Sequence, residues 1–267
     1  MKLCFSTLGC PEWTWGEIVT AAHELGFDGV EVRGVHKEIY APAVPDFQPG
    51  KLNATHAELN RLGLTIPCLT TACNLNDREQ HAAMIAEGKV YIALAQALGV
   101  PYIRILPDLT AHPEAEVDEE LVRAGALELA QAAKGTGVTL LLETNGYYAD
   151  SNRLLRLIQA VDRPEIAVLW DIHHPYRYFG EAPETTYRRL APYIRHVHVK
   201  DSRMVAGKAK YCMLGTGDIP VAACVKLLEQ GNYRGYYSLE WLRRFDLSLE
   251  EAGVVFAQYV SKMRTYG

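Results

Sequence analysis

The 267-residue sequence contains no long hydrophobic run, no block of like charges and no C-x-x-C cysteine pair. No segment reaches the roughly 18 consecutive apolar residues of a membrane-spanning helix, so we expect no membrane association. The apolar stretch within MKLCFSTLGCPEW is too short for a signal peptide, and we therefore expect a cytoplasmic protein. The net charge of −5 provides no basic face, which argues against a nucleic-acid partner and favours a small, polar substrate.

The six cysteines form no C-x-x-C motif and stand mostly in apolar, strand-like or helix-like runs. This placement is typical of reduced structural thiols rather than of a disulfide framework. A structural zinc centre is not expected either, because such centres draw on cysteine ligands and no cysteine here is placed to join one.

Short β-rich runs alternate with longer amphipathic stretches along a sequence that is 49% hydrophobic. A parallel sheet with crossover helices requires this alternation, and a barrel of eight strand–helix units takes roughly 250 residues. We therefore predict the α/β class and a (β/α)8 TIM barrel, with residues 1–267 as a single domain. The predicted strands are residues 2–7, 29–34, 64–70, 101–106, 139–144, 166–171, 194–200 and 236–241.

Glycine and proline positions mark the predicted connections between these elements. Four predicted helices end next to a glycine that would stop them: Gly26, Gly63, Gly99 and Gly137. Residues 36–50 contain three prolines and are predicted to be an irregular loop at the active-site mouth. Residues 201–220, rich in glycine and lysine, are predicted to be a loop that closes over a substrate, with Asp218 as the N-cap of the next helix.

Four predicted strands in the second half of the chain each end on a side chain that can bind a metal: Glu143, Asp171, His198 and Glu240. The spacing between one of these strand-end residues and the next is close to the length of one strand–helix unit. In a barrel, the carboxyl ends of the strands surround one mouth, so these residues could meet there. Any one of them alone would be explained as an ordinary polar residue at a strand end. Four on successive strands favour a single metal site, and three carboxylates with one imidazole suit Mn²⁺, Mg²⁺, Co²⁺ or Zn²⁺.

Strand alternation brings further charged side chains towards the predicted interior. Lys200 should face the same ligand as His198, where its ammonium can stabilise an enolate oxygen or hold a phosphate or carboxylate; a solvated strand-end lysine is the alternative. Arg104 is either a fork for two substrate oxygens or one partner of a buried ion pair. Glu31 and Arg33 alternate inwards in the same way and are assigned a structural or rim role.

Five short motifs follow one another along the chain: E-x-N at 143–145, D-x-H-H-P at 171–175, H-V-H-V-K-D at 196–201, L-G-T-G-D-I at 214–219, and the strand-end Glu240. Together they resemble the xylose isomerase-like TIM-barrel superfamily over the whole chain. That superfamily contains sugar isomerases, ketose 3-epimerases, inosose and 3-dehydroshikimate dehydratases, and endonuclease IV-type nucleases. The resemblance implies the TIM-barrel fold and one divalent metal ion as cofactor.

The resemblance also implies roles for single residues, beginning with the four strand-end residues as metal ligands. His198 is implied rather than His196, because the family's ligand lies three residues before the aspartate of H-x-x-D; His196 is then a core or supporting residue. His174 matches the family's substrate-contacting or acid/base histidine, with a structural loop histidine as the alternative. Asn145, from the E-x-N motif, joins Arg104, His174 and Lys200 as a predicted substrate-binding residue.

The reaction expected from these residues is proton transfer next to a carbonyl group. A divalent ion would polarise an α-hydroxyketone, while Glu143 and Glu240 remove and return a proton on opposite faces, as the paired glutamates do in the resembling epimerases. We therefore predict a metal-dependent isomerase or epimerase of a sugar or sugar phosphate. The alternative is a metal-dependent dehydratase of the inosose or 3-dehydroshikimate type, in which His174 protonates the departing hydroxyl.

Two further functional classes receive less support from the sequence. A trinuclear nuclease is not expected, because Tyr211 and Ala209 stand where that branch has a histidine and an aspartate ligand. A catalytically silent carbohydrate-binding barrel is disfavoured by the complete set of four strand-end residues. The exact substrate, the identity of the metal and the existence of a homo-oligomer are left open by the sequence.

Overall fold

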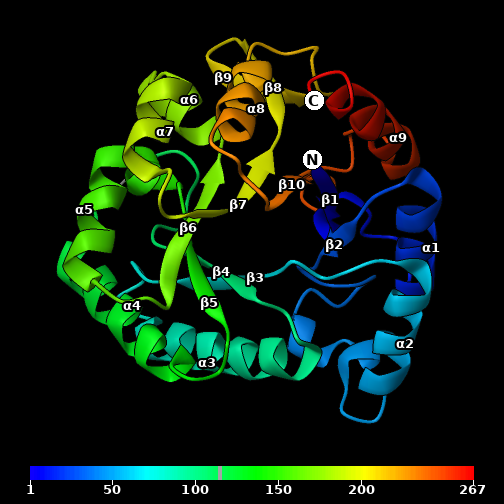
Figure 1. Cartoon of the computed structure of the whole chain (residues 1–267). Helices are drawn as coiled ribbons and strands as arrows, with labels where there is room; N and C mark the ends of the chain where they lie inside the picture. The colour runs from blue at the N-terminus through cyan, green and yellow to red at the C-terminus, as the bar shows by residue number, and fades with distance from the viewer. Residues whose placement is uncertain (114–115) are drawn as a thin grey trace. The chain divides into compact units, whose positions relative to one another are not determined.

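The computed structural model describes residues 1–113 and 116–267 as strands and helices in alternation. Eight parallel strands form one sheet in the order β2-β1-β10-β7-β6-β5-β4-β3 (Figure 1). The strands are β1 Lys2–Ser6, β2 Gly29–Glu31, β3 Cys68–Asn74, β4 Tyr102–Leu106, β5 Thr139–Glu143, β6 Ile166–Asp171, β7 Ile194–Val199 and β10 Tyr236–Leu239. The helices are α1 Trp15–Leu25, α2 Leu52–Leu62, α3 His81–Leu98, α4 Glu119–Ala133, α5 Ser151–Val161, α6 His173–Phe179, α7 Pro183–Leu190, α8 Val221–Gln230 and α9 Ala252–Met263. This arrangement confirms the predicted α/β class.

Two strands differ from their predicted bounds for identifiable reasons. Strand β2 ends at Glu31, because the backbone N–H groups of Arg33 and Gly34 donate to the Thr7 hydroxyl instead of to a neighbouring strand. Strand β3 begins at Cys68 rather than at residue 64, directly after Pro67. Proline lacks the N–H donor that a central strand needs, so the continuous pairing with β4 begins beyond it, and Thr65 makes only an isolated bridge to Gly29.

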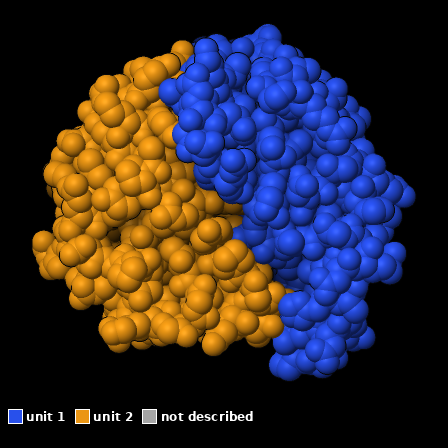
Figure 2. All heavy atoms as spheres, in the orientation of Figure 1, with its two compact units in different colours: residues 1–67, 197–267 blue, residues 68–196 orange. Residues whose placement is uncertain are grey.

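The chain divides into two compact units, one of residues 1–67 with 197–267 and the other of residues 68–196 (Figure 2). In the first unit, β1 pairs with β2 and β10, and β10 pairs with β7. Its core contains stacked rings: the centroids of Phe5 and Phe256 are 4.1 Å apart, and Phe27 meets both Phe5 and Tyr259. These rings connect β1 to α9. That residues 1–267 form one domain remains a prediction.

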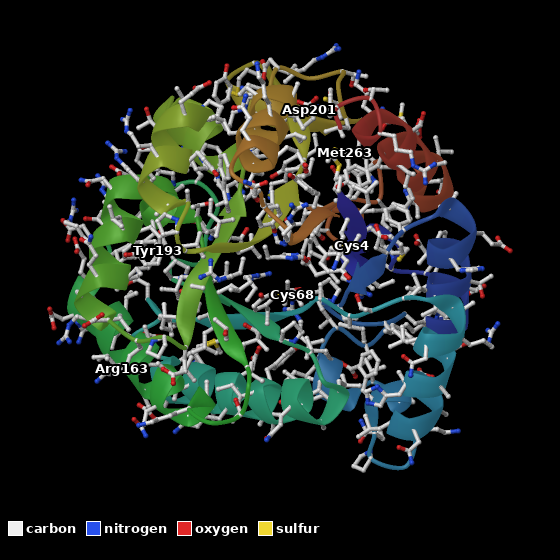
Figure 3. The ribbon with its side chains drawn as sticks, viewed as in Figure 1. Cys4, Cys68, Arg163, Tyr193, Asp201 and Met263 are labelled. Carbon is white, nitrogen blue, oxygen red and sulfur yellow. The ribbon has the colours of Figure 1, made fainter. Side chains whose placement is uncertain are left out.

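In the second unit, β3, β4, β5 and β6 pair in succession around an apolar cluster. The cluster consists of Cys68, which is labelled in Figure 3, with Leu141, Ala167 and Leu169, and Tyr102 packs against it. Helices α3 and α4 approach closely at Gly88, where a Cβ atom would lie 2.7 Å from the Leu129 side chain. A larger residue at this position would require the Leu129 side chain or the two helices to shift.

Three of the four predicted glycine stops are confirmed. Helices α1, α2 and α3 end at Leu25, Leu62 and Leu98, and the next residue in each case is a left-handed glycine. The fourth prediction was wrong, because α4 already ends at Ala133 and its C-cap is Lys134. Within the described residues, none of the helices combines the length and hydropathy needed to cross a membrane. All six cysteines are free thiols, as predicted.

Residues 201–220 contain a β-hairpin that the sequence did not predict. Strands β8 (Asp201–Val205) and β9 (Lys208–Cys212) pair antiparallel through a two-residue turn. The turn residues Ala206 and Gly207 both have positive φ, the combination that a tight hairpin turn requires. Asp218 is not the N-cap of α8; the cap position is Pro220, and the Asp218 N–H donates to the Ser202 carbonyl.

Candidate functional site

The ends of β5 and β6 carry two of the four strand-end residues. Glu143 is the last residue of β5 and Asp171 the last of β6, and both are buried. Thr144 ties these ends together: its Oγ1 accepts from the Asp171 N–H at 2.9 Å and donates to the Asp171 carbonyl at 3.1 Å. The hydroxyl thereby fixes the position of Asp171 next to β5. Thr144 was not predicted, and no signal beyond its position in E-T-N could have identified it.

Arg104 forms the buried ion pair that was one of its two predicted roles. It is in β4, and its Nε lies 3.2 Å from Oε2 of Glu143, with both side chains almost fully buried. Isolated charges are costly to bury, so each side chain stabilises the other in this interior position. The guanidinium also restricts the orientation of the Glu143 carboxylate.

His174 lies in the first turn of α6 and is held by a hydrogen bond to the residue that follows β5. Its Nδ1 lies 3.0 Å from the Thr144 carbonyl oxygen, and its Nε2 lies 3.5 Å from Oδ2 of Asp171. A carbonyl can only accept, so Nδ1 carries the hydrogen and a neutral ring has its lone pair on Nε2. The structure thus brings His174 to Asp171, and the predicted role of His174 towards a substrate remains a prediction.

Asn145 lies in the same region, with its amide hydrogens donated to the loop after β4. Its Nδ2 is 2.7 Å from the Asp108 carbonyl oxygen and 3.2 Å from that of Thr110. The next residue, Gly146, has positive φ, and a Cβ there would lie 2.2 Å from Oδ2 of Asp108. Asn145 therefore anchors this loop, and its predicted contact with substrate remains a prediction.

Residues able to bind a metal gather at the end of β6. Asp171, His173 and His174 each offer a ligand atom, and these atoms lie within 4.8 Å of one another. Carboxylate and imidazole donors suit Zn²⁺, Mn²⁺ and related divalent ions. The second unit therefore contains an acidic and histidine-rich group with the chemistry of a metal site.

The ends of β7 and β10 carry the other two strand-end residues. His198 is in β7, and Glu240 follows β10 directly; both are buried. The Nδ1 atom of His198 lies 3.5 Å from Oε1 of Glu240. The other carboxylate oxygen, Oε2, accepts a hydrogen bond from Nζ of Lys200. Lys200 is only 2% exposed, so its solvated alternative is wrong.

Glu31 contacts the strand-end residue His198, although the sequence predicted only a structural or rim role for it. Both of its carboxylate oxygens lie next to Nε2 of His198, at 3.1 and 3.0 Å. Burial raises the pKa of the neighbouring Cys4 thiol well above its ordinary value, and the negative charge of Glu31 raises it further. Cys4 is therefore a neutral thiol. Arg33 donates instead to the Ile39 carbonyl, at 2.8 Å, and braces the loop after β2.

Asp201 organises the segment that follows β7. Its carboxylate accepts hydrogen bonds from four backbone N–H groups: those of Ser202, Gly215, Gly217 and Ile219. A carboxylate that accepts several N–H groups orders a loop strongly. The L-G-T-G-D-I motif (214–219) is thus a turn that binds the carboxylate of Asp201, which directly follows Lys200 in the sequence and is labelled in Figure 3.

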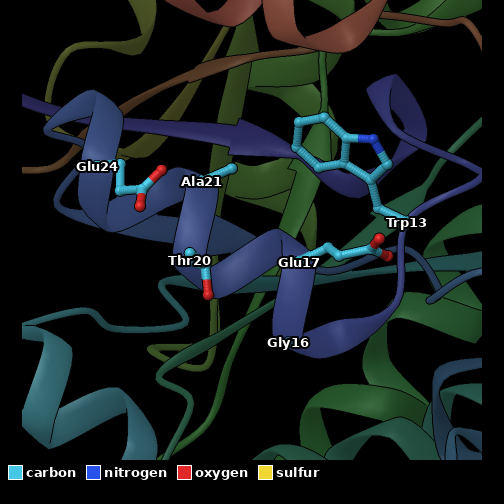
Figure 4. A pocket seen from close by; sticks show the side chains of 6 residues that line it. All are labelled: Trp13, Gly16, Glu17, Thr20, Ala21 and Glu24. Atoms are coloured by element: carbon cyan, nitrogen blue, oxygen red, sulfur yellow. The ribbon is translucent and has the colours of Figure 1, made fainter.

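A separate cavity of about 400 Å³ lies over α1. Figure 4 shows it between the Trp13 ring and the side chains of the helix. Its lining residues are Trp13, Gly16, Glu17, Thr20, Ala21 and Glu24. None of them is a predicted site residue, and Glu17 is already engaged in the capping box of α1.

Several known proteins are similar to the chain. Fructoselysine 3-epimerase from Shigella flexneri is 23% identical over 235 residues, which is 82% of each chain. D-allulose 3-epimerase from Methylomonas sp. has a TM-score of 0.79 at 16% identity, over 100% of this chain and 98% of that one. The probable 3-DHS dehydratase AsbF from Bacillus anthracis has a TM-score of 0.78 at 18% identity, over 99% of both. A Mycobacterium smegmatis protein crystallised with magnesium has a TM-score of 0.75 at 17% identity, over 99% of this chain and 96% of that one.

These structural similarities, all at low identity, support the predicted TIM-barrel fold. The model of the xylose isomerase-like TIM barrel family matches residues 19–256. This match confirms the resemblance inferred from the five motifs. Since it extends over most of the sequence, the chain belongs to the xylose isomerase-like TIM barrel family.

Proposed function

We propose that this protein is a divalent-metal-dependent isomerase or epimerase of a sugar or sugar phosphate. The observation that carries the proposal is that two strand-end glutamates are each held by a buried cation. Glu143 is paired with Arg104, and Glu240 is paired with Lys200. Two oriented carboxylates suit a reaction in which one group removes a proton and the other returns it. The similarity to fructoselysine 3-epimerase and D-allulose 3-epimerase supports this reaction class.

The four strand-end residues fit a divalent metal by their chemistry. All four are buried, and together they offer three carboxylates and one imidazole. In a TIM barrel the carboxyl ends of the strands face a common mouth, so we propose that the four meet there as ligands of one Mn²⁺, Co²⁺, Mg²⁺ or Zn²⁺ ion. When bound, the ion would polarise the substrate carbonyl and increase the acidity of the neighbouring C–H bond. The magnesium complex of the Mycobacterium smegmatis protein supports this assignment.

The side chains around the proposed metal site have separate roles in the proposed proton transfer. An ionised carboxylate of Glu143 or Glu240 takes the proton from the carbon next to the carbonyl. The other glutamate, protonated, returns a proton to the opposite face, which inverts that carbon. Arg104 and Lys200 orient these carboxylates and lower the cost of negative charge that develops on substrate oxygens. His174 and Asn145 are proposed to contact substrate hydroxyls.

A dehydratase of the inosose or 3-dehydroshikimate type is the second candidate. The orientation of His174 favours it: Nδ1 is bound to the Thr144 carbonyl, so Nε2 is the nitrogen that can accept and deliver a proton. Protonation of a departing β-hydroxyl by Nε2 would release water. The similarity to the probable dehydratase AsbF supports this alternative.

The experiment that tests the proposal begins with the metal content of the purified protein. Ketoses, inososes and 3-dehydroshikimate are then incubated with the protein in D2O and followed by mass spectrometry. The proposal predicts that a ketose gains one deuterium and changes configuration without loss of water. Loss of water from inosose or 3-dehydroshikimate would select the dehydratase instead. A small carbohydrate-like substrate and the cytoplasm as location remain predictions.

A further inference from the structure

We propose that Glu31 is a positioning residue that makes Nδ1 of His198 the metal-binding atom. The inference rests on the proposed function, because it takes His198 as a metal ligand. It adds a residue from β2 to the site and commits to one ring nitrogen and one tautomer of the histidine. All of its contacts lie within the first unit, residues 1–67 with 197–267.

The first observation is the contact between the imidazole and the carboxylate. Nε2 of His198 lies 3.1 Å from Oε1 and 3.0 Å from Oε2 of Glu31, and both residues are fully buried. An ionised carboxylate can only accept hydrogen bonds, so Nε2 must carry the hydrogen. In the neutral imidazole the lone pair then belongs to Nδ1, and a metal takes the nitrogen that has the lone pair.

The second observation concerns the opposite edge of the ring. Nδ1 of His198 is 3.5 Å from Oε1 of Glu240. In the neutral ring with its hydrogen on Nε2, Nδ1 and the carboxylate oxygen have no hydrogen to share, so no hydrogen bond joins them. Two ligands at about 2.0–2.2 Å from one divalent ion would lie about 3–3.5 Å apart, which agrees with the observed distance. Lys200 holds the other oxygen of Glu240, so Oε1 is the oxygen turned towards the imidazole.

Glu31 would act on the metal only through His198. A carboxylate bonded to the second nitrogen of a ligand histidine fixes the ring and raises the basicity of the first nitrogen. A purely structural pair would stabilise the fold without selecting a ligand atom. The two roles therefore differ in a property that spectroscopy can measure.

The test uses the full-length protein with Zn²⁺ as the probe, and it compares wild type with Glu31→Gln and Glu31→Leu. Nitrogen-15 NMR of labelled histidine reports the tautomer of His198 and the nitrogen that binds zinc, with assignment by a His198→Gln variant. Zinc affinity is measured by competition with a chromophoric chelator. Glu229→Gln is the matched control, because Glu229 also accepts a side-chain hydrogen bond, from Tyr237, at a position outside the site.

We expect Nε2 of His198 to be protonated in the metal-free wild type and Nδ1 to bind zinc. Glu31→Leu should weaken zinc binding about 10–100-fold, and Glu31→Gln should weaken it less, because an amide oxygen still accepts from Nε2. The control should bind zinc as wild type does. Zinc on Nε2, or unchanged affinity in both Glu31 variants, would overturn the inference while the proposed function stands. Zinc on Nδ1 without turnover of any tested sugar would refute the proposed function and leave the role of Glu31 intact. A wild type that does not bind zinc would refute both.

Discussion

Nε of Arg104 lies 3.2 Å from Oε2 of Glu143 in a pair that is almost completely buried. Lys200 makes the corresponding contact with Glu240. Each glutamate proposed to move a proton thus has its own cation, on a neighbouring strand or directly after one. The two pairs orient the carboxylates and compensate their charge before any substrate arrives.

Replacement of Lys200 by methionine should destabilise the metal-free protein. The change leaves the buried Glu240 carboxylate without its cation, at a cost on the order of 3–5 kcal/mol in the free energy of unfolding. Addition of a divalent ion should recover part of that loss, because the ion supplies positive charge at the same carboxylate. Urea unfolding with and without metal measures both effects.

The matched control for this prediction is Lys89→Met. Lys89 also pairs with a glutamate, Glu128 at 2.7 Å, but both side chains are about half exposed. An exposed pair contributes about 0–1 kcal/mol, so the control should unfold nearly as wild type does. Equal effects of the two substitutions would contradict the assignment of a buried functional pair.

Glu143→Gln and Glu240→Gln should each suppress turnover far more than substrate binding. The amide keeps the size and one oxygen but cannot take up the proton, so kcat should fall about 10²–10⁴-fold while KM changes little. Glu87→Gln serves as the control, because Glu87 accepts a hydrogen bond from the Ala72 N–H and is no part of the site. Near-normal kcat in both site variants, with metal bound, would make the carboxylates ligands only.

His174→Asn separates the epimerase from the dehydratase. Asparagine can still donate to the Thr144 carbonyl but cannot deliver a proton, so a dehydratase should lose about 10²–10⁴-fold in rate. An epimerase should keep much of its solvent deuterium exchange, because its proton moves through the glutamates. His23→Asn is a close control, since Nδ1 of His23 also lies 3.0 Å from a backbone carbonyl, that of Leu62. Full activity of His174→Asn with every substrate would exclude both roles.

The protein should lose stability as the pH rises above about 9. Burial raises the pKa of Cys73 from an ordinary value of 9.0 to about 12. The unfolded chain therefore releases this proton at a lower pH than the folded chain, and between these values the unfolding free energy falls by about 1.4 kcal/mol per pH unit for this thiol. Urea unfolding between pH 8 and 10.5 measures the slope. Cys73→Ala should reduce the slope, and an identical slope in that variant would show that the thiol does not contribute.

The alternation of strands and helices could be predicted because the spacing of apolar residues along the sequence differs between the two. Glycine stops at Gly26, Gly63 and Gly99 were visible for the same reason, since a residue with positive φ favours glycine. The β8–β9 hairpin was missed because Ala206, unlike asparagine or glycine, gives no turn signal before Gly207. The prediction of Asp218 as the N-cap of α8 was wrong, because the backbone N–H of Asp218 donates to the carbonyl of Ser202 in the preceding segment.

The site could be predicted only in part. The four strand-end residues were visible because strand ends and metal-capable side chains coincide along the chain. The partners of those residues depend on tertiary contacts: Thr144 with Asp171, and Glu31 with His198 across 167 positions of sequence. Strand alternation predicted that the Glu31 side chain faces inwards, but it could not predict which residue this side chain contacts.

Metal stoichiometry tests the central claim most directly. Wild type and the variants Glu143→Ala, Asp171→Ala, His198→Ala and Glu240→Ala are loaded with Mn²⁺, dialysed, and analysed by inductively coupled plasma mass spectrometry, with circular dichroism to verify folding. If the four strand-end residues bind one ion, wild type retains one Mn²⁺ per chain and each folded variant retains much less. Full retention of the ion in the folded variants, or no ion in wild type, would contradict the account.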